Sequence, residues 1–257
     1  MTILDDILKE KELEVEKLKE TYTRQDRAVR QVDVSLYDTF MHAKRMSIIA
    51  EMKRASPSKG LINDKVEPAV QGKEYEACGA GTISVLTDQP FFKGTMEDLA
   101  AVREVVNIPV LNKDFIIDEI QLDRAKDYGA NVILLIAAAL PKERLKQLFD
   151  YAKKLELEIL FEVHNEEEME VAIEIGASII GVNNRNLKTF EVDLATTERL
   201  AKMVDTKKIL LISESGIKTR ADVERVRDVG ARGILVGETM MRSANLKETF
   251  DDLRINL

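Results

Sequence analysis

The sequence predicts an α/β fold, a single (β/α)8 TIM barrel with an extra N-terminal helical segment. From residue 48 onward, eight short apolar runs alternate with eight longer segments of helical periodicity. The runs lack strict polar alternation, which indicates parallel strands buried on both faces. Four of the helical segments end in a glycine suited to a left-handed C-cap. We expect residues 1–257 to form one domain, with a helical extension over 1–46 and the barrel over 47–257.

Each expected strand is a short run rich in Ile, Val and Leu. The strands span residues 48–52, 82–86, 109–111, 132–136, 158–163, 179–182, 209–213 and 233–236. The expected helices span residues 68–77, 95–106, 117–128, 141–155, 166–175, 194–203, 220–229 and 245–253. The capping glycines are Gly79, Gly129, Gly176 and Gly230. Eight strand-helix units favour closure of the sheet into a barrel.

The segment before the barrel has a pattern of its own. Thr2 followed by Asp5 resembles a capping box, and apolar residues then recur at helical spacing. They are Ile3, Leu4, Ile7, Leu8, Val15 and Leu18. Lys11 interrupts this stripe and Leu13 lies to one side of it. We expect a helix over residues 2–20 that packs on the barrel; a coiled-coil arm for dimerisation is the alternative.

Composition limits the classes of function. With 38 basic and 46 acidic residues the net charge is −8, which argues against general binding of nucleic acid. The longest apolar run, residues 132–140, is too short to span a membrane, and no signal-peptide pattern is present at the N-terminus. We therefore expect a cytoplasmic protein that does not bind membranes, and a monomer, with a dimer as the alternative.

Cysteine and histidine are scarce. Cys78 is the single cysteine, which excludes an internal disulfide, and the two histidines are His42 and His164. No His/Cys cluster has metal-ligand spacing, so we expect no metal site.

Polar residues are concentrated where the expected strands end. Reactive groups of such barrels lie at the C-terminal ends of strands. The strand ends present Glu51, Lys53, Ser56, Ser58, Lys59, Thr87, Asp88, Lys113, Asp114, Glu162, Asn183, Asn184, Arg185, Asn186, Ser213, Glu214, Ser215, Gly216, Gly237 and Glu238. Isolated buried charges cost several kcal/mol each, by a rough estimate, so such a set must either neutralise itself or bind a ligand. We favour a ligand, because a barrel built for stability would carry apolar side chains here.

Two lysines and a glutamate are the strongest catalytic candidates. Glu51 and Lys53 are two apart on one strand and project to the same side. Lys113 comes from a different strand, so a substrate across the barrel mouth can contact both lysines and the Glu162 carboxylate. This arrangement suits general acid-base catalysis.

Small residues follow the last two strands. Ser215-Gly216 and Gly237-Glu238 lie where many barrels hold phosphate with backbone N–H groups and a short helix N-terminus. Together with the segment over residues 56–60 after the first strand, they favour a phosphate monoester as ligand.

Seven motifs at the strand ends resemble one family. The segment IAEMKRASPSKG at residues 49–60 is similar to the first-strand signature of indole-3-glycerol-phosphate synthases. Further matches are SVLT at 84–87, KDFI at 113–116, FEVH at 161–164, GVNNRNL at 181–187, SESGI at 213–217 and VGE at 236–238. The resemblance implies a carboxy-lyase of tryptophan biosynthesis that closes the indole ring of 1-(2-carboxyphenylamino)-1-deoxyribulose 5-phosphate, a phosphorylated anthranilate-sugar adduct. It implies no cofactor or metal.

The resemblance also implies a role for each site residue. Lys113 is expected to be the general acid and Glu162 the base, while Lys53 contacts the substrate carboxylate and serves as a second acid. Glu51 and Asn183 are expected to orient these groups. The binding residues are expected to be Arg185 for the carboxylate, Glu214 for the polar floor, and Ser56, Ser215, Gly216, Gly237 and the backbone of Glu238 for the phosphate. The Glu238 side chain is expected to point away from the phosphate.

Other functions remain open at this stage. A sugar-phosphate isomerase or a Schiff-base aldolase using Lys113 or Lys53 is one alternative. A catalytically silent phosphate binder, or a scaffold in a pathway complex, is another. The composition of residues 54–63 also permits a mobile lid.

Overall fold

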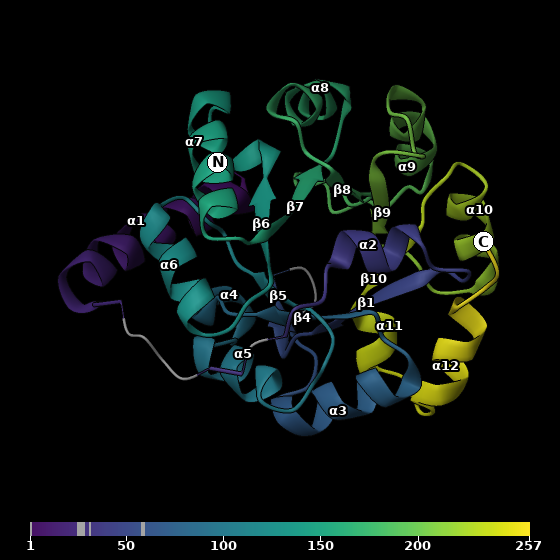
Figure 1. Ribbon diagram of the computed structural model, residues 1–257, viewed down its shortest axis with the longest axis horizontal. Helices are drawn as coiled ribbons and strands as arrows, with labels where there is room; N and C mark the ends of the chain where they lie inside the picture. Colours follow the sequence, from purple (N-terminus) through teal and green to yellow (C-terminus); the bar gives the residue numbers. More distant parts are fainter. Residues whose placement is uncertain (1, 25–28, 31, 58–59) are drawn as a thin grey trace.

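Parallel strands close into a barrel at the centre of the computed structural model, which describes residues 2–24, 29–30, 32–57 and 60–257 (Figure 1). Within these residues the barrel strands are β1 (Ser47–Met52), β4 (Thr82–Leu86), β5 (Val110–Lys113), β6 (Val132–Ile136), β7 (Glu158–Val163), β8 (Ile179–Asn183), β9 (Leu210–Glu214) and β10 (Gly233–Val236). Each strand pairs with its neighbours in chain order, and β1 pairs with β10 to close the ring. The predicted (β/α)8 fold is confirmed.

Helices surround the strands, one after each strand. They are α3 (Pro68–Cys78), α5 (Met96–Arg103), α6 (Glu119–Asp127), α7 (Lys142–Lys154), α8 (Glu166–Ile175), α9 (Ala195–Leu200), α10 (Arg220–Arg227) and α12 (Leu246–Leu253). The four glycines predicted as left-handed caps all have positive φ. Short elements fill the connections: α4 (Gln89–Phe92), η1 (Ala137–Ala139), η2 (Ala201–Met203), α11 (Glu238–Met241), and a hairpin of β2 (Ala55–Ser56) and β3 (Gly60–Leu61).

Three strands extend further than the apolar pattern indicated. Lys113, Asn183 and Glu214 are the last residues of β5, β8 and β9, whereas the predicted strands ended before them. In the ladders Lys113 pairs with Leu86, and Glu214 pairs with Asn183. Hydrophobicity marks the end of the apolar run, but the hydrogen-bonded ladder continues into the polar mouth. The strand frame therefore fixes the direction of these three side chains.

The opposite end of the barrel is closed by α2 (Leu36–Met41). Phe40 is fully buried and packs with Leu36 in the apolar layer inside the barrel. The Glu158 carboxylate, at the start of β7, accepts hydrogen bonds from Ser35 Oγ at 2.8 Å and from the Leu36 backbone at 2.6 Å. With this end filled, an open pocket remains at the C-terminal ends of the strands.

The N-terminal helix α1 (Ile3–Thr21) packs on the barrel, as predicted. Thr2 and Asp5 form the expected capping box. The interpretation of Lys11 as an interruption of the apolar stripe is wrong, because Lys11 is 1% exposed and lies on the buried face. Its ammonium group pairs with Asp88 at 3.0 Å and with Asp114 at 2.8 Å. Periodicity alone places every lysine in solvent, whereas the Lys11 ammonium group pairs with two carboxylates beneath the helix.

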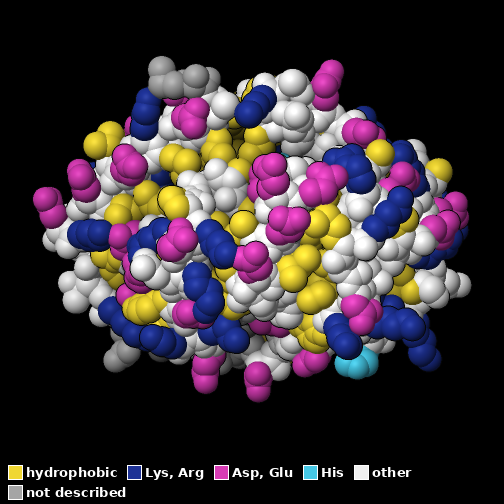
Figure 2. Space-filling model, turned by 90° about the horizontal axis from the view of Figure 1, so that it is seen from above, with side chains coloured by type: hydrophobic (Ala, Val, Ile, Leu, Met, Phe, Trp, Pro, Cys, Tyr) yellow, Lys and Arg dark blue, Asp and Glu magenta, His cyan; other side chains and the backbone are white. Residues whose placement is uncertain are grey.

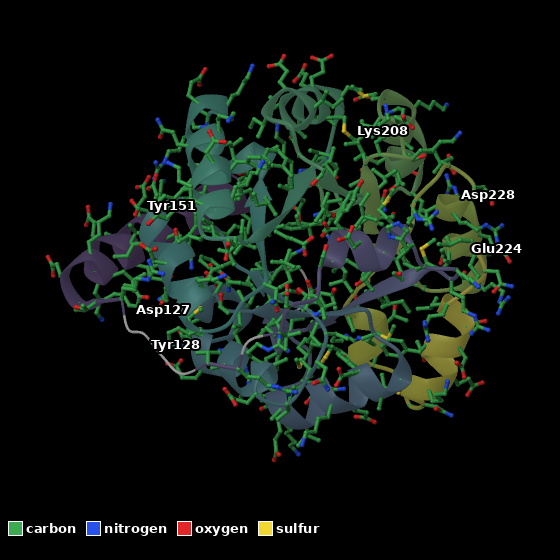
Figure 3. All side chains as sticks on the ribbon, in the orientation of Figure 1. Asp127, Tyr128, Tyr151, Lys208, Glu224 and Asp228 are labelled. Carbon is green, nitrogen blue, oxygen red and sulfur yellow. The ribbon has the colours of Figure 1, made fainter. Side chains whose placement is uncertain are left out.

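Polar contacts also hold the outer layer together. Asp127 on α6 accepts a hydrogen bond from Tyr22, just after α1, and Tyr151 on α7 donates to Asp123 at 3.0 Å; Asp127 and Tyr151 are labelled in Figure 3. On the face in Figure 2, acidic and basic side chains are interspersed and not segregated by sign. Among the described helices, none has both the length and the apolar character needed to cross a membrane.

Candidate active site

A pocket of about 950 Å³ opens at the C-terminal ends of the barrel strands. All twelve residues to which the family resemblance assigns a role line this pocket. They are Glu51, Lys53, Ser56, Lys113, Glu162, Asn183, Arg185, Glu214, Ser215, Gly216, Gly237 and Glu238. Residues from distant parts of the chain therefore converge, as the strand-end argument requires.

Lys113 lies at the centre of the charged groups. Its Nζ is 2.8 Å from Glu214 Oε2, 3.5 Å from Glu162 Oε2 and 4.0 Å from Glu51 Oε2. Burial alone would lower the pKa of Lys113, but the three carboxylates outweigh it and raise that pKa above its ordinary value. Lys113 is thus held as an ammonium ion, a form that can donate a proton.

Glu51 and Lys53 project from β1 and the residue after it to the same side. Lys53 Nζ is 2.5 Å from Glu51 Oε1, and the Lys53 side chain is more exposed, at 21% against 5%. Burial would raise the pKa of Glu51, but Lys53 and Lys113 together keep that pKa below its usual value. Glu51 is therefore an anion between the two lysines, and Lys53 extends toward the open part of the pocket.

Glu162 differs from its neighbours in the groups around it. Its Oε1 accepts a hydrogen bond from Asn183 Nδ2 at 3.2 Å, and its Oε2 faces Lys113. Burial would raise the pKa of Glu162, but Lys113, His164 and Asn183 reverse the effect and hold it well below its usual value. An ionised carboxylate beside an ammonium group is the state that a base needs before it accepts a proton.

Glu214 behaves in the opposite way. Burial and the nearby Glu162 and Glu51 carboxylates outweigh the attraction of Lys113, and they raise the pKa of Glu214 to about 7. Its second oxygen, Oε1, has no hydrogen-bond partner in the described part of the chain and lies against Gly181, where a Cβ would come within 2.0 Å of it. A glycine is required at residue 181 for Glu214 to keep this place.

Small residues form the other side of the pocket. Ser215 and Gly216, directly after β9, both have positive φ, at 66° and 89°. Gly237 is the N-cap of the short helix α11, and it too lines the pocket. The Glu238 carboxylate pairs with Arg242 Nε at 3.1 Å, so this anion is partly neutralised beside the loops.

The hairpin after β1 lies over the pocket edge. Ser56, at the end of β2, is 8% exposed and lines the pocket. Arg54 pairs with Asp98 at the start of α5, which ties the base of the hairpin to the barrel. Ser58 and Lys59, which also belong to the expected signature, lie outside the described residues.

An apolar wall of the pocket was not foreseen from the sequence. Ile3, Leu4 and Ile7 of α1 line it together with Phe92 and Phe115, whose ring centroids are 6.0 Å apart. The only sequence signal was the apolar stripe of α1, which we assigned to packing. The first turns of this stripe are largely buried, and they also line the pocket, where they form a surface suited to a flat apolar ligand.

Some strand-end candidates serve structure instead. Asp88 and Asp114 turn toward Lys11 of α1. Asn184 Nδ2 donates to Ser213 Oγ at 2.9 Å, and Thr197 Oγ1 donates to Asn184 Oδ1 at 2.8 Å, in a buried network. Among the residues described, no three His, Cys, Asp or Glu side chains are arranged to hold a metal ion.

Two solved structures share the barrel. A thiamine phosphate pyrophosphorylase from Pyrococcus furiosus superposes with a TM-score of 0.58 at 18% identity, over 81% of this chain and 93% of that one. An N-acetylmannosamine-6-phosphate 2-epimerase from Clostridium perfringens gives 0.63 at 16% identity, over 84% and 95%. At these identities the likeness concerns the fold alone.

Sequence comparison is more specific. The family model described as "Indole-3-glycerol phosphate synthase" matches residues 4–253. Proteins of that name from Bacillus cereus and Oceanobacillus iheyensis are 52% and 53% identical over 258 residues, covering 100% of this chain and 99% and 98% of theirs. These matches run through α1 and the whole barrel, so the chain belongs to the indole-3-glycerol phosphate synthase family.

Proposed function

We propose that the protein closes the indole ring of 1-(2-carboxyphenylamino)-1-deoxyribulose 5-phosphate, with loss of carbon dioxide and water, to give indole-3-glycerol phosphate. The observation that carries this proposal is the pair Lys113 and Glu162. Their charged atoms are 3.5 Å apart in one pocket, and their surroundings hold the lysine protonated and the glutamate ionised. Family membership supplies the reaction that such an acid and base serve.

Lys113 acts as the general acid of ring closure. The attacking ring carbon is a weak nucleophile and the sugar carbonyl is a modest electrophile, so the developing oxyanion must be stabilised. The raised pKa of Lys113 ensures that an ammonium group is present at neutral pH. Lys113 donates its proton to the carbonyl oxygen as the carbon-carbon bond forms.

Glu162 and Lys53 serve the later steps. Departure of carbon dioxide returns its bonding electrons to the ring and restores aromaticity. In the dehydration, Glu162 accepts the proton that the new five-membered ring loses, and Lys53 protonates the hydroxyl group that departs as water. Glu51 and Asn183 orient these groups, since they contact Lys53 and Glu162 respectively.

Binding uses both sides of the pocket. Lys53 and Arg185 receive the substrate carboxylate, the apolar wall receives the aromatic ring, and Glu214 completes the polar floor. The phosphate is bound by Ser56, Ser215, Gly216, Gly237 and the backbone N–H of Glu238. The Glu238 carboxylate pairs with Arg242. This ion pair supports the assignment, because it gives the carboxylate a cationic partner, so that only the backbone N–H of Glu238 is needed for the phosphate.

The aldolase alternative is disfavoured by the charges around Lys113. A Schiff base requires a neutral amine, whereas three carboxylates surround Lys113 and raise its pKa. Borohydride added with substrate should therefore give no covalent adduct. A mass gain on Lys113 would support the aldolase instead.

The direct test is to incubate the purified protein with the synthetic adduct and follow indole fluorescence. We expect the signal to rise catalytically, with many turnovers per molecule of protein. No signal from a folded preparation would refute the proposal and favour a silent phosphate binder.

We further propose that residues 1–257 act as one domain, a monomer that works in the cytoplasm. The buried ion pairs of Lys11 support the single domain, because they join the N-terminal extension to the ends of β4 and β5. Light scattering measures the mass in solution, and twice the chain mass of 29.0 kDa would support the dimer instead.

A further inference from the structure

His164 follows β7 directly and does not line the pocket. Its side chain is 11% exposed and lies between two carboxylates. Nδ1 is 2.9 Å from Glu168 Oε2, and Nε2 is 3.2 Å from Glu162 Oε1. The second contact is an ion pair without aligned hydrogen-bond geometry. The imidazole therefore reaches the reacting groups only through Glu162.

Glu168 fixes the position of this imidazole. It lies in the first turn of α8, where its carboxylate accepts hydrogen bonds from the His164 backbone N–H at 2.8 Å and from Asn165 Nδ2 at 2.8 Å. A carboxylate so held can only accept, so Nδ1 carries a proton and Nε2 is turned to Glu162. Burial would lower the pKa of His164, but the two carboxylates outweigh it and raise that pKa to about 10.

The two oxygens of Glu162 have different neighbours. Oε1 faces His164 and Asn183, whereas Oε2 faces Lys113 and the pocket. His164 and Asn183 thus engage Oε1, which leaves Oε2 to Lys113 and the reacting atoms. Asn183 is a neutral donor, so among the described contacts of Oε1 the positive charge comes from His164.

The balance of charge on the pocket floor also indicates that Glu162 needs the cation of His164. Glu162 shares the pocket floor with Glu51 of β1 and Glu214 of β9, whose charges oppose its ionisation. Lys53 pairs with Glu51, but Lys113 of β5 is shared among all three carboxylates. A protonated His164 supplies Glu162 with a cation that the substrate does not contact and that donates no proton in the reaction.

We propose that His164, held by Glu168, is a positioning residue that keeps Glu162 ionised and turned with Oε2 toward the pocket. This inference rests on the proposed role of Glu162 as the base. It assigns to His164 and Glu168 a part in the reaction although neither touches the substrate.

The first test is the titration of His164 by NMR in the substrate-free protein. The chain has two histidines, and His42 is on the surface as an internal reference. We expect His164 to stay protonated at neutral pH in the wild type. Replacing either carboxylate, by Glu162→Gln or Glu168→Gln, should lower its titration midpoint by about 1 pH unit or more. A neutral His164 in the wild type, or a midpoint that neither variant moves, would overturn the proposal.

The second test is kinetic and uses His164→Gln, with His42→Gln as the matched control. Loss of the cation raises the pKa of Glu162, so the acidic limb of kcat should move to higher pH by about 1 unit. We expect kcat to fall roughly tenfold and KM to stay within about threefold, because substrate contacts are untouched. Glu168→Gln should shift the limb in the same direction by less, and His42→Gln should leave it in place.

Three outcomes decide between the proposals. If His164 only stabilises the fold, His164→Gln will have a lower folded fraction but an unmoved acidic limb of kcat. That result would overturn the inference. If that variant does not fold, Glu168→Gln and the NMR titration decide in its place. A Glu162→Gln variant with normal turnover would refute the base itself, whereas its loss of turnover combined with an unmoved limb in His164→Gln would refute only the positioning role.

Discussion

The barrel carries two buried charge clusters, one at Lys113, the last residue of β5, and one at Asp114, the residue after it. Lys113 meets Glu51, Glu162 and Glu214 in the pocket, whereas the Asp114 carboxylate pairs with Lys11 of α1. One dipeptide therefore contributes to both the pocket and the attachment of the N-terminal helix.

The clusters differ in how completely their groups are paired. Lys11 has three carboxylate partners, and Asp114 in addition accepts hydrogen bonds from Thr87 Oγ1 and the Phe115 backbone. In the pocket, one oxygen of Glu214 has no hydrogen-bond partner among the described residues, and the pKa of Glu214 differs greatly from that of Glu162. A fully paired cluster holds elements together, whereas a partly paired one keeps its groups available for a ligand and for proton transfer.

The largest expected effect comes from the pocket lysine. Lys113→Ala removes the proposed acid and should lower kcat by about 10²-fold or more, measured by indole fluorescence. Its unfolding free energy in urea should fall less than that of Lys11→Met, because the remaining pocket carboxylates are able to take up protons. A near-normal kcat for Lys113→Ala would show that Lys113 is not the general acid of the reaction.

The paired cluster should respond in stability. Lys11→Met leaves Asp88 and Asp114 buried without their cation, so we expect the unfolding free energy to fall by about 3–5 kcal/mol. Lys17→Met, an exposed position on the same helix, is the matched control and should change it by less than about 0.5 kcal/mol. Equal effects of the two substitutions would show that the buried ion pairs do not hold α1.

A smaller effect separates the clusters by pH. Because the pKa of Glu214 is raised from 4.5 to about 7, the folded protein binds more protons at this group than the unfolded chain between those values. Its contribution to stability is thus present at low pH and lost as the pH rises through the folded value. The unfolding free energy of the wild type should therefore fall relative to that of Glu214→Gln, by on the order of 1 kcal/mol, between about pH 5 and about pH 8. Urea unfolding at the two pH values measures this, and a constant difference between the proteins would contradict the raised pKa.

Much of the pocket could be predicted because barrel geometry turns a position in sequence into a position in space. Once the strands were recognised, the polar residues at their ends had to meet at one mouth, and Lys113, Glu162 and Glu214 do. The same rule could not separate the two clusters. Asp88 and Asp114 satisfy it equally well, but both lie just beyond their strands and pair with Lys11 of α1.

Features that depend on contacts between distant segments could not be predicted. Lys11 broke the apolar pattern of α1, and its partners Asp88 and Asp114 are far along the chain. Short elements such as α2 and the β2–β3 hairpin are too brief to give a clear periodicity. His164 entered the sequence argument as part of a family motif and as one of too few metal ligands, and its contacts with two carboxylates became visible only in the fold.

The most direct measurement is the turnover of Glu162→Gln with the synthetic adduct, compared with the wild type at the same pH. The substitution keeps the size of the side chain and its contact with Asn183 but removes the charge that accepts the proton. We expect kcat to fall by about 10²-fold or more while KM stays within about threefold. A variant that turns over at nearly the wild-type rate would contradict the assignment of Glu162 as the base of the reaction.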